Sequence, residues 1–129
     1  MTYVQGFIIP VPKANKEAYI KVAKASGVIF QDYGAVRIVE SWSETTPDGK
    51  VTDFKKAVKA EDDEAVVFSW IEWPDQATCD AAAEKMQNDP RFEEMGEMPF
   101  DGKRLIYAGY DPIFEIGQQK TRFSERVFF

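Results

Sequence analysis

Four short segments rich in β-branched and aromatic residues alternate with segments of helical periodicity, and this order constrains the fold more than any other feature of the chain. The predicted strands are residues 3–11, 35–43, 65–73 and 103–110. Residues 16–34 carry apolar side chains at spacings of three and four, which predicts an amphipathic helix that Asn15 caps and Gly34 ends. Asp75 is placed to cap a second helix, and Asp89-Pro90 starts a short third one, because proline suits the first helical position.

The resulting β-α-β-β-α-β order predicts an α+β, ferredoxin-like protomer, in which a four-stranded antiparallel sheet carries both main helices on one face. The other face would then present large apolar side chains from every strand, more than a soluble monomer usually exposes. A second copy is the simplest cover, since twofold dimers are the commonest homo-oligomers, and we expect a homodimer. We assign residues 1–114 to this domain. Residues 115–129 end in two phenylalanines, and we expect them to dock as a tail on their own or the partner protomer.

Composition narrows the chemistry further. The chain carries 16 Lys and Arg against 22 Asp and Glu, a net charge of −6, which disfavours binding to a phosphate backbone. The absence of histidine and the presence of a single cysteine, Cys79, exclude imidazole-ligated haem, Ser-His-Asp catalysis and the usual zinc sites. We therefore expect no cofactor and no metal.

No apolar run approaches the roughly 20 residues that span a bilayer. The first residues lack the basic and apolar regions of a signal peptide. With one free thiol, these features predict a cytoplasmic protein that does not engage a membrane.

The candidate site is a set of aromatic and acidic residues on the second and third predicted strands. Its members are Glu40, Trp42, Phe68, Trp70 and Glu72. Their matching parity predicts that they share one sheet face if the two strands pair. The functional interpretation is a cavity inside a dimer barrel, with indoles as stacking walls for a planar organic ligand and carboxylates as proton acceptors. The alternative is an ordinary dimer core whose glutamates lie at the rim, solvated or paired with Arg37, Arg104 or Lys103.

Two further features have competing interpretations. Tyr107 and Tyr110 are candidate proton donors, although tyrosines on strands more often belong to a core or an interface. Phe68 and Trp70 imitate the base-stacking aromatics of an RNA-recognition motif, which shares the predicted strand order. The Lys/Arg-Gly start of that motif's signature is absent, and the acidic residues 61–64 stand where basic ones are needed, so we expect no nucleic-acid partner.

Several long stretches of the chain match a known family. They are YVQGFIIPVPKANKEAY (3–19), VTDFKKAVKA (51–60), VVFSWIEWPD (66–75), NDPRFEEMG (88–96) and MPFDGKRLIYAGYDPI (98–113). These stretches resemble the YbaA-like bacterial family of unknown function, within the dimeric α/β-barrel superfamily. The resemblance implies a ferredoxin-like protomer whose sheet packs against its twofold mate to form a barrel.

The resemblance carries over no active site. The superfamily includes cofactor-free monooxygenases, lactone isomerases, haem-dependent enzymes and amino-acid-binding regulatory domains, and the haem branch usually relies on a histidine that this chain lacks. The implied function is a small-molecule enzyme, monooxygenase-like or isomerase-like. The alternative is a non-enzymatic ligand-binding or stress-sensing module, and a base facing the ligand would separate the two.

Overall fold

The computed structural model describes residues 2–117 and contains one antiparallel sheet with helices. Its elements are β1 (Tyr3–Pro12), α1 (Lys16–Asp32), β2 (Arg37–Ser43), α2 (Phe54–Ala57), β3 (Glu64–Trp73), α3 (Gln76–Met86), α4 (Pro90–Glu94) and β4 (Ile106–Tyr110), with 3-10 turns at Lys13–Asn15 and Gly102–Arg104. The predicted docking of the terminal tail concerns mainly residues 118–129, which lie outside the described part.

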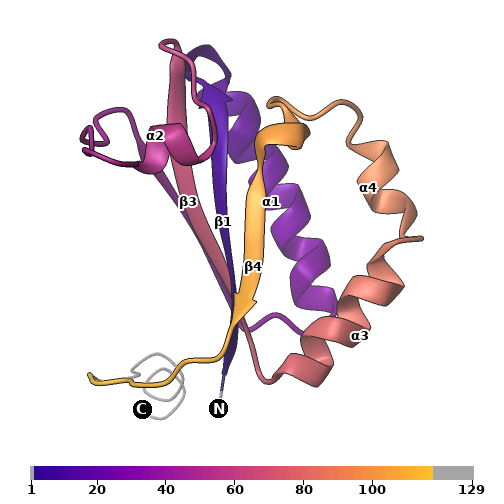
Figure 1. Cartoon of the computed structure of the whole chain (residues 1–129). Coiled ribbons are helices and arrows are strands. Elements are labelled where there is room, and N and C mark those ends of the chain that lie inside the picture. The colour runs from indigo at the N-terminus through magenta and orange to yellow at the C-terminus, as the bar shows by residue number, and fades with distance from the viewer. Residues whose placement is uncertain (1, 118–129) are drawn as a thin grey trace, which may run out of the picture.

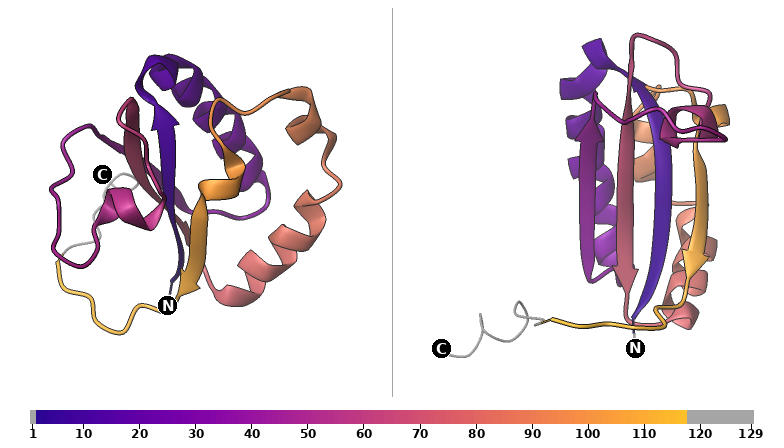
Figure 2. Two further views of the ribbon diagram at one scale, coloured as in Figure 1. Left: turned by 45° about the horizontal axis from the view of Figure 1, so that its top comes forward. Right: turned by 60° about the vertical axis from the view of Figure 1, so that its left-hand side comes forward.

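The strands lie in the order β2-β3-β1-β4, and every neighbouring pair is antiparallel (Figure 2). The helices α1, α3 and α4 lie on one side of this sheet, whereas α2 and the segment after β4 lie on the other (Figure 1). This arrangement confirms the predicted α+β, ferredoxin-like protomer. Within residues 2–117, no helix is long and apolar enough to cross a bilayer.

The side of the sheet that faces α1 and α3 carries the hydrophobic core. Odd-numbered residues of β1 and β3 point to this side, and the register sets Ile9 opposite Val67 and Tyr3 opposite Trp73. Trp73 is fully buried, and its indole N–H donates to Gln5 Oε1 at 2.9 Å. The helices contribute the buried residues Tyr19, Ile29, Cys79 and Ala82. Burial of these side chains is the main stabilising term that holds the helices on the sheet.

Two of the three predicted helix caps are present. Asp75 accepts a hydrogen bond from the backbone N–H of Thr78 at 2.8 Å, and Asp89 accepts one from Arg91 at 2.9 Å, with Pro90 in the first turn. The predicted cap by Asn15 is wrong. Its side-chain amide instead donates to the carbonyl oxygen of Pro99 at 3.0 Å, because a 3-10 turn precedes α1 and aims Asn15 at another segment.

The fourth strand is shorter than predicted because its first residues form a turn. Asp101 accepts hydrogen bonds from the backbone N–H of Lys103 and from Arg104 Nε, both at 3.0 Å, and these bonds hold a 3-10 turn where a strand was expected. The turn directs Arg104 to Glu64, whose carboxylate receives two bonds of 2.7 Å. The Glu64 side chain is only 4% exposed, so it is anchored at the start of β3 rather than solvated.

The opposite side of the sheet, which we call the open face, is reached by even-numbered residues of β1, β3 and β4. Its large apolar residues Phe68, Ile106 and Tyr110 are 46%, 43% and 59% exposed. The short helix α2 covers one end, where Phe54 meets Phe68 edge-on with ring centroids 6.1 Å apart. The open face is therefore the part of the sheet that a ligand or a partner can reach.

Candidate functional site

The five predicted site residues do not share a face, and that part of the prediction is wrong. In the β2–β3 register Glu40 lies opposite Ser69 and Trp42 opposite Val67, which places both on the side of the helices. Phe68, Trp70 and Glu72 point to the open face. The reason is that the register pairs even-numbered residues of β2 with odd-numbered residues of β3. Matching parity therefore separates the side chains instead of uniting them.

Trp42 belongs to the core rather than to a cavity wall. Its ring packs against Tyr19 with centroids 6.4 Å apart, and the Lys16 ammonium lies 5.4 Å from the ring centroid. The indole N–H donates to Glu44 Oε2 at 2.9 Å. These contacts fix the indole on the helix side of the edge strand β2.

The open face contains a hollow of about 690 Å³, which we call the open-face hollow. It is lined by Val4, Gly6, Phe7, Ile8, Phe68, Trp70, Ile106, Tyr107, Ala108 and Tyr110. Gly6 lies opposite Trp70 on one side and Ala108 on the other, so two small residues form its floor. The larger side chains around these two residues form the walls of the hollow. Phe68 and Trp70, two of the predicted residues, are among these walls, with ring centroids 5.8 Å apart.

Glu72, the remaining predicted residue on this face, lies beside the hollow and is already engaged. Its Oε2 accepts hydrogen bonds from the Trp70 indole at 3.0 Å and from Arg37 NH1 at 3.1 Å. The pairing with Arg37 matches one of the ion pairs that the interface interpretation allowed. The hydrogen bond to Glu72 orients the Trp70 indole, and the Arg37–Glu72 ion pair places charge at the edge of an otherwise apolar hollow.

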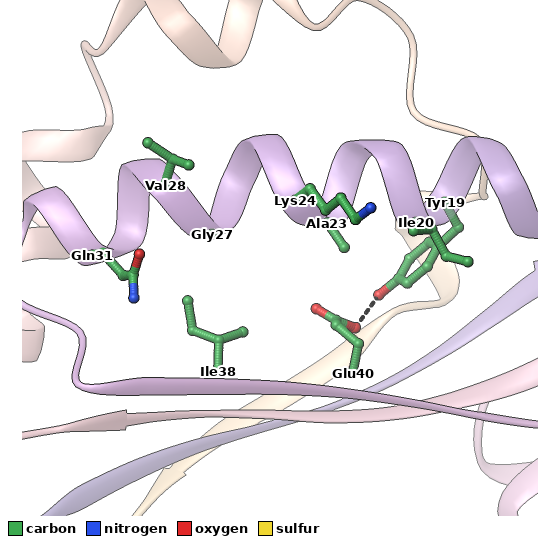
Figure 3. Close-up of a pocket in the computed structure, with 9 residues that line it drawn as sticks. All are labelled: Tyr19, Ile20, Ala23, Lys24, Gly27, Val28, Gln31, Ile38 and Glu40. Atoms are coloured by element: carbon green, nitrogen blue, oxygen red, sulfur yellow. Dashed lines mark hydrogen bonds between the residues drawn. The ribbon is translucent and has the colours of Figure 1, made fainter. Parts of the chain in front are cut away.

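A second depression, which we call the α1–β2 groove, lies on the helix side of the sheet (Figure 3). It has a volume of about 620 Å³ and is lined by Tyr19, Ile20, Ala23, Lys24, Gly27, Val28, Gln31, Ile38 and Glu40. Tyr19 from α1 and Glu40 from β2 point toward one another, and the tyrosine hydroxyl donates to Glu40 Oε1 at 2.6 Å (Figure 3). This pair was missed from the sequence. The one signal was a lone carboxylate among the apolar side chains of its strand face, Val36, Ile38 and Trp42.

Burial and the hydrogen bond between Tyr19 and Glu40 change the pKa values of both groups. The Glu40 residue as a whole is exposed along the groove, yet burial of its carboxylate raises its pKa, and hydrogen bonding to Tyr19 and Ser69 offsets part of the rise. Tyr19 is buried, and burial followed by the bond to Glu40 raises its pKa far above the ordinary value. At neutral pH the tyrosine is therefore a hydrogen-bond donor and never a base.

Tyr107 and Tyr110, the two predicted proton donors, line the open-face hollow, whereas Cys79 lies in the core. Tyr107 stacks on Phe7 at 5.7 Å, and Tyr110 ends β4 on the open face. Cys79 is buried in α3, and burial raises the pKa of its thiol, which makes it a poor nucleophile. Within residues 2–117, no three His, Cys, Asp or Glu side chains gather in a way that could hold a metal ion.

Comparison with known proteins places the chain among uncharacterised relatives. Residues 2–102 match the family described as "Protein of unknown function (DUF1428)". The chain is 54% identical over 116 residues to "Uncharacterized protein YbaA" of Escherichia coli strain K12, which covers 89% of this chain and 99% of that protein. The Shigella flexneri protein of the same description matches with the same identity and coverage.

Proposed function

This chain belongs to the DUF1428 family, as its resemblance to YbaA-like proteins predicted, and from that premise we propose that it is a cytoplasmic homodimer that binds a small organic molecule. The two open faces would meet, and each open-face hollow would become part of an enclosed chamber. The ligand would be planar and largely apolar.

The uncovered apolar surface supports the dimer. Phe68, Ile106 and Tyr110 are about half exposed, and a fully covered aromatic side chain buries roughly 150–250 Å². Together with their neighbours they offer an apolar patch of several hundred Å², which is at the limit of what monomers tolerate. A standard interface takes about 800 Å² from each partner, a comparable area.

The single observation that carries ligand binding is the floor of the hollow at Gly6. A side chain would fit there, because an added Cβ would meet only Tyr110 Cε1, at an ordinary contact distance of 3.7 Å, and the backbone needs no positive φ. Glycine inside a strand costs roughly 0.5–1 kcal/mol, and each buried methylene that fills an interface contributes about 0.8 kcal/mol. A face that only had to pack on its mate would gain by filling this position. The empty space is therefore more useful to a ligand than to the interface.

The walls indicate the class of ligand. The tilted rings of Phe68 and Trp70 offer flat apolar surfaces for stacking, and the Arg37–Glu72 pair at the edge offers one polar anchor. A conjugated or aromatic ring with one polar substituent fits this combination.

Binding without turnover is the form of the function that the open face supports. A cofactor-free oxygenase or isomerase would need a carboxylate in the chamber that is free to accept a proton. Glu72 is bound by both Arg37 and Trp70, and Glu40 lies on the other side of the sheet. Glu72 therefore serves better as an anchor than as a base.

The experiment combines light scattering with fluorescence titration of 8-anilinonaphthalene-1-sulfonate. The wild-type protein should have about twice the mass of 14.7 kDa and bind the probe, whereas Gly6→Val should stay dimeric and folded but bind it at least tenfold more weakly. Gly102→Val, in an exposed turn with nothing within 4 Å of the added Cβ, is the matched control and should bind normally. A monomeric wild type would contradict the dimer, and unchanged binding by Gly6→Val would contradict the chamber.

A further inference from the structure

We propose that the α1–β2 groove is a second binding site, independent of the open-face hollow, and that it takes a primary amine with an apolar body, whose ammonium group pairs with Glu40. The two sites lie on opposite sides of the sheet. Binding in the groove therefore does not depend on the dimer or its chamber.

The Glu40 carboxylate is held in a fixed position at one end of the groove (Figure 3). The bond from Tyr19 at 2.6 Å occupies Oε1. The tyrosine itself is only 6% exposed, and its ring packs between Trp42 and Phe100, with centroid distances of 6.4 and 5.9 Å. A carboxylate fixed by a buried donor is preorganised, so a ligand does not need to order it on binding.

Glu40 differs from Glu64 and Asp89, whose side chains are almost fully buried, because its carboxylate lies in an open groove and pairs with no cation of residues 2–117. Glu64 is paired with Arg104, and Asp89 is paired with Arg91. Within residues 2–117, Glu40 forms no ion pair with a lysine or an arginine. A partly buried negative charge without a counter-charge costs free energy, which a bound ammonium group would recover. The raised pKa of Glu40 is consistent with this incomplete compensation.

The rest of the groove is suited to an apolar body. Ile20, Ala23, Val28 and Ile38 supply aliphatic walls between helix and strand. Gly27, in the middle of α1, leaves space beside Ile38. A side chain would fit in this space, because an added Cβ would meet only Ile38 Cδ1, at an ordinary contact distance of 3.7 Å. Helix-interior glycine costs about 1 kcal/mol relative to alanine, so packing alone does not account for it. Lys24 also lines the groove, but it is exposed and does not reach the carboxylate.

The test is isothermal titration at pH 7 with 2-phenylethylamine and its neutral analogue 2-phenylethanol. The amine should bind, and the alcohol should bind at least tenfold more weakly, because only the amine supplies a positive charge. Glu40→Gln keeps an acceptor for Tyr19 but removes the charge, and it should weaken amine binding at least tenfold. Glu17→Gln removes an exposed carboxylate from α1, the helix that lines the groove, and should leave binding unchanged.

A second variant tests the groove rather than the charge. Gly27→Leu should fill the space beside Ile38 and abolish amine binding, while leucine's helix propensity keeps α1 intact. The proposal is overturned if amine and alcohol bind equally, if neither binds, or if Glu40→Gln or Gly27→Leu binds the amine as well as the wild type. Gly6→Val, which fills the open-face hollow, should leave amine binding unchanged, so the two proposed sites can fail separately.

Discussion

Glu40 lies directly opposite Ser69 across β2 and β3, and this pairing places its carboxylate under α1 rather than beside Trp70. One register therefore divides the acidic and aromatic residues of two neighbouring strands between two sides of the sheet. On the open face, Phe68 and Trp70 line an apolar hollow. On the helix side, Glu40 and Tyr19 form a polar end to a separate groove.

Trp70 and Trp42 should respond differently to ligand binding, although both are tryptophans on adjacent strands. Trp70→Ala removes a wall of the open-face hollow and should weaken binding of 8-anilinonaphthalene-1-sulfonate by about 1–3 kcal/mol, the usual contribution of a buried stacking side chain. Trp42→Phe changes a core residue on the other side and should leave the affinity unchanged. Fluorescence titration of both variants measures this. Equal losses in the two would contradict the separation of the two faces.

Glu40→Gln should change stability in a way that depends on pH. Because burial raises the pKa of Glu40 in the folded protein, the folded state binds more protons than the unfolded chain over the interval above the ordinary value of 4.5. The wild type therefore loses stability from this group as the pH rises through that interval. The variant does not titrate there, so its stability relative to the wild type should increase from about pH 4 to pH 7. Urea denaturation across this range measures the effect, and a constant difference would contradict it.

Asp89 should stabilise the contact between α4 and the end of α1. Hydrogen bonds hold the pKa of Asp89 well below its usual range. Those from Arg91 have the largest effect, and the bond from the Tyr33 hydroxyl adds to it. A lowered pKa contributes stability that is present above the ordinary value and is lost as the pH falls through the folded value. Asp89→Asn should therefore lower the melting temperature at pH 7, and its difference from wild type should shrink below about pH 4.

The matched control for Asp89 is Asp32, which binds the same Arg91 at 2.6 Å but is 55% exposed. Asp32→Asn should change the melting temperature much less, since exposed ion pairs contribute little. Thermal melts of both variants from pH 7 to pH 2 compare their losses in melting temperature. A larger loss in Asp32→Asn would show that the burial argument is wrong.

Arg104→Met should be strongly destabilising because it leaves Glu64 buried without its partner. The pair has two bonds of 2.7 Å, and removing one member of an enclosed ion pair costs roughly 3 kcal/mol. The double variant Glu64→Leu/Arg104→Met should recover much of this loss, since no charge then stays buried. Urea denaturation of the three proteins forms the comparison. A double variant as unstable as Arg104→Met would mean that the charge is not the cause.

The sequence was sufficient for the architecture because strand and helix periodicities are local signals. The succession of strands and helices along the chain and the helix caps at Asp75 and Asp89 follow from residues close in the chain. The start of β4 was misplaced because the Asp101 side chain competes with strand pairing by capping a 3-10 turn.

The candidate site was harder to predict because it depends on long-range register. A shift of one residue between β2 and β3 moves every side chain to the other face, and the loop between these strands does not fix that register. The contact between Tyr19 and Glu40 joins residues 21 positions apart and needs both the register and the position of α1. The pairing of Arg37 with Glu72, in contrast, follows once the two strands are aligned.

The central claim, that two copies meet through their open faces, is tested most directly by light scattering of wild type, Ile106→Glu and Val28→Glu at micromolar concentration. Ile106 is 43% exposed on the open face, and Val28 is 57% exposed on α1, so the two substitutions place the same charge on opposite sides of the molecule. We predict about twice 14.7 kDa for the wild type and Val28→Glu, and a folded monomer for Ile106→Glu. A monomeric wild type, or a dimer that Ile106→Glu leaves intact, would contradict the claim.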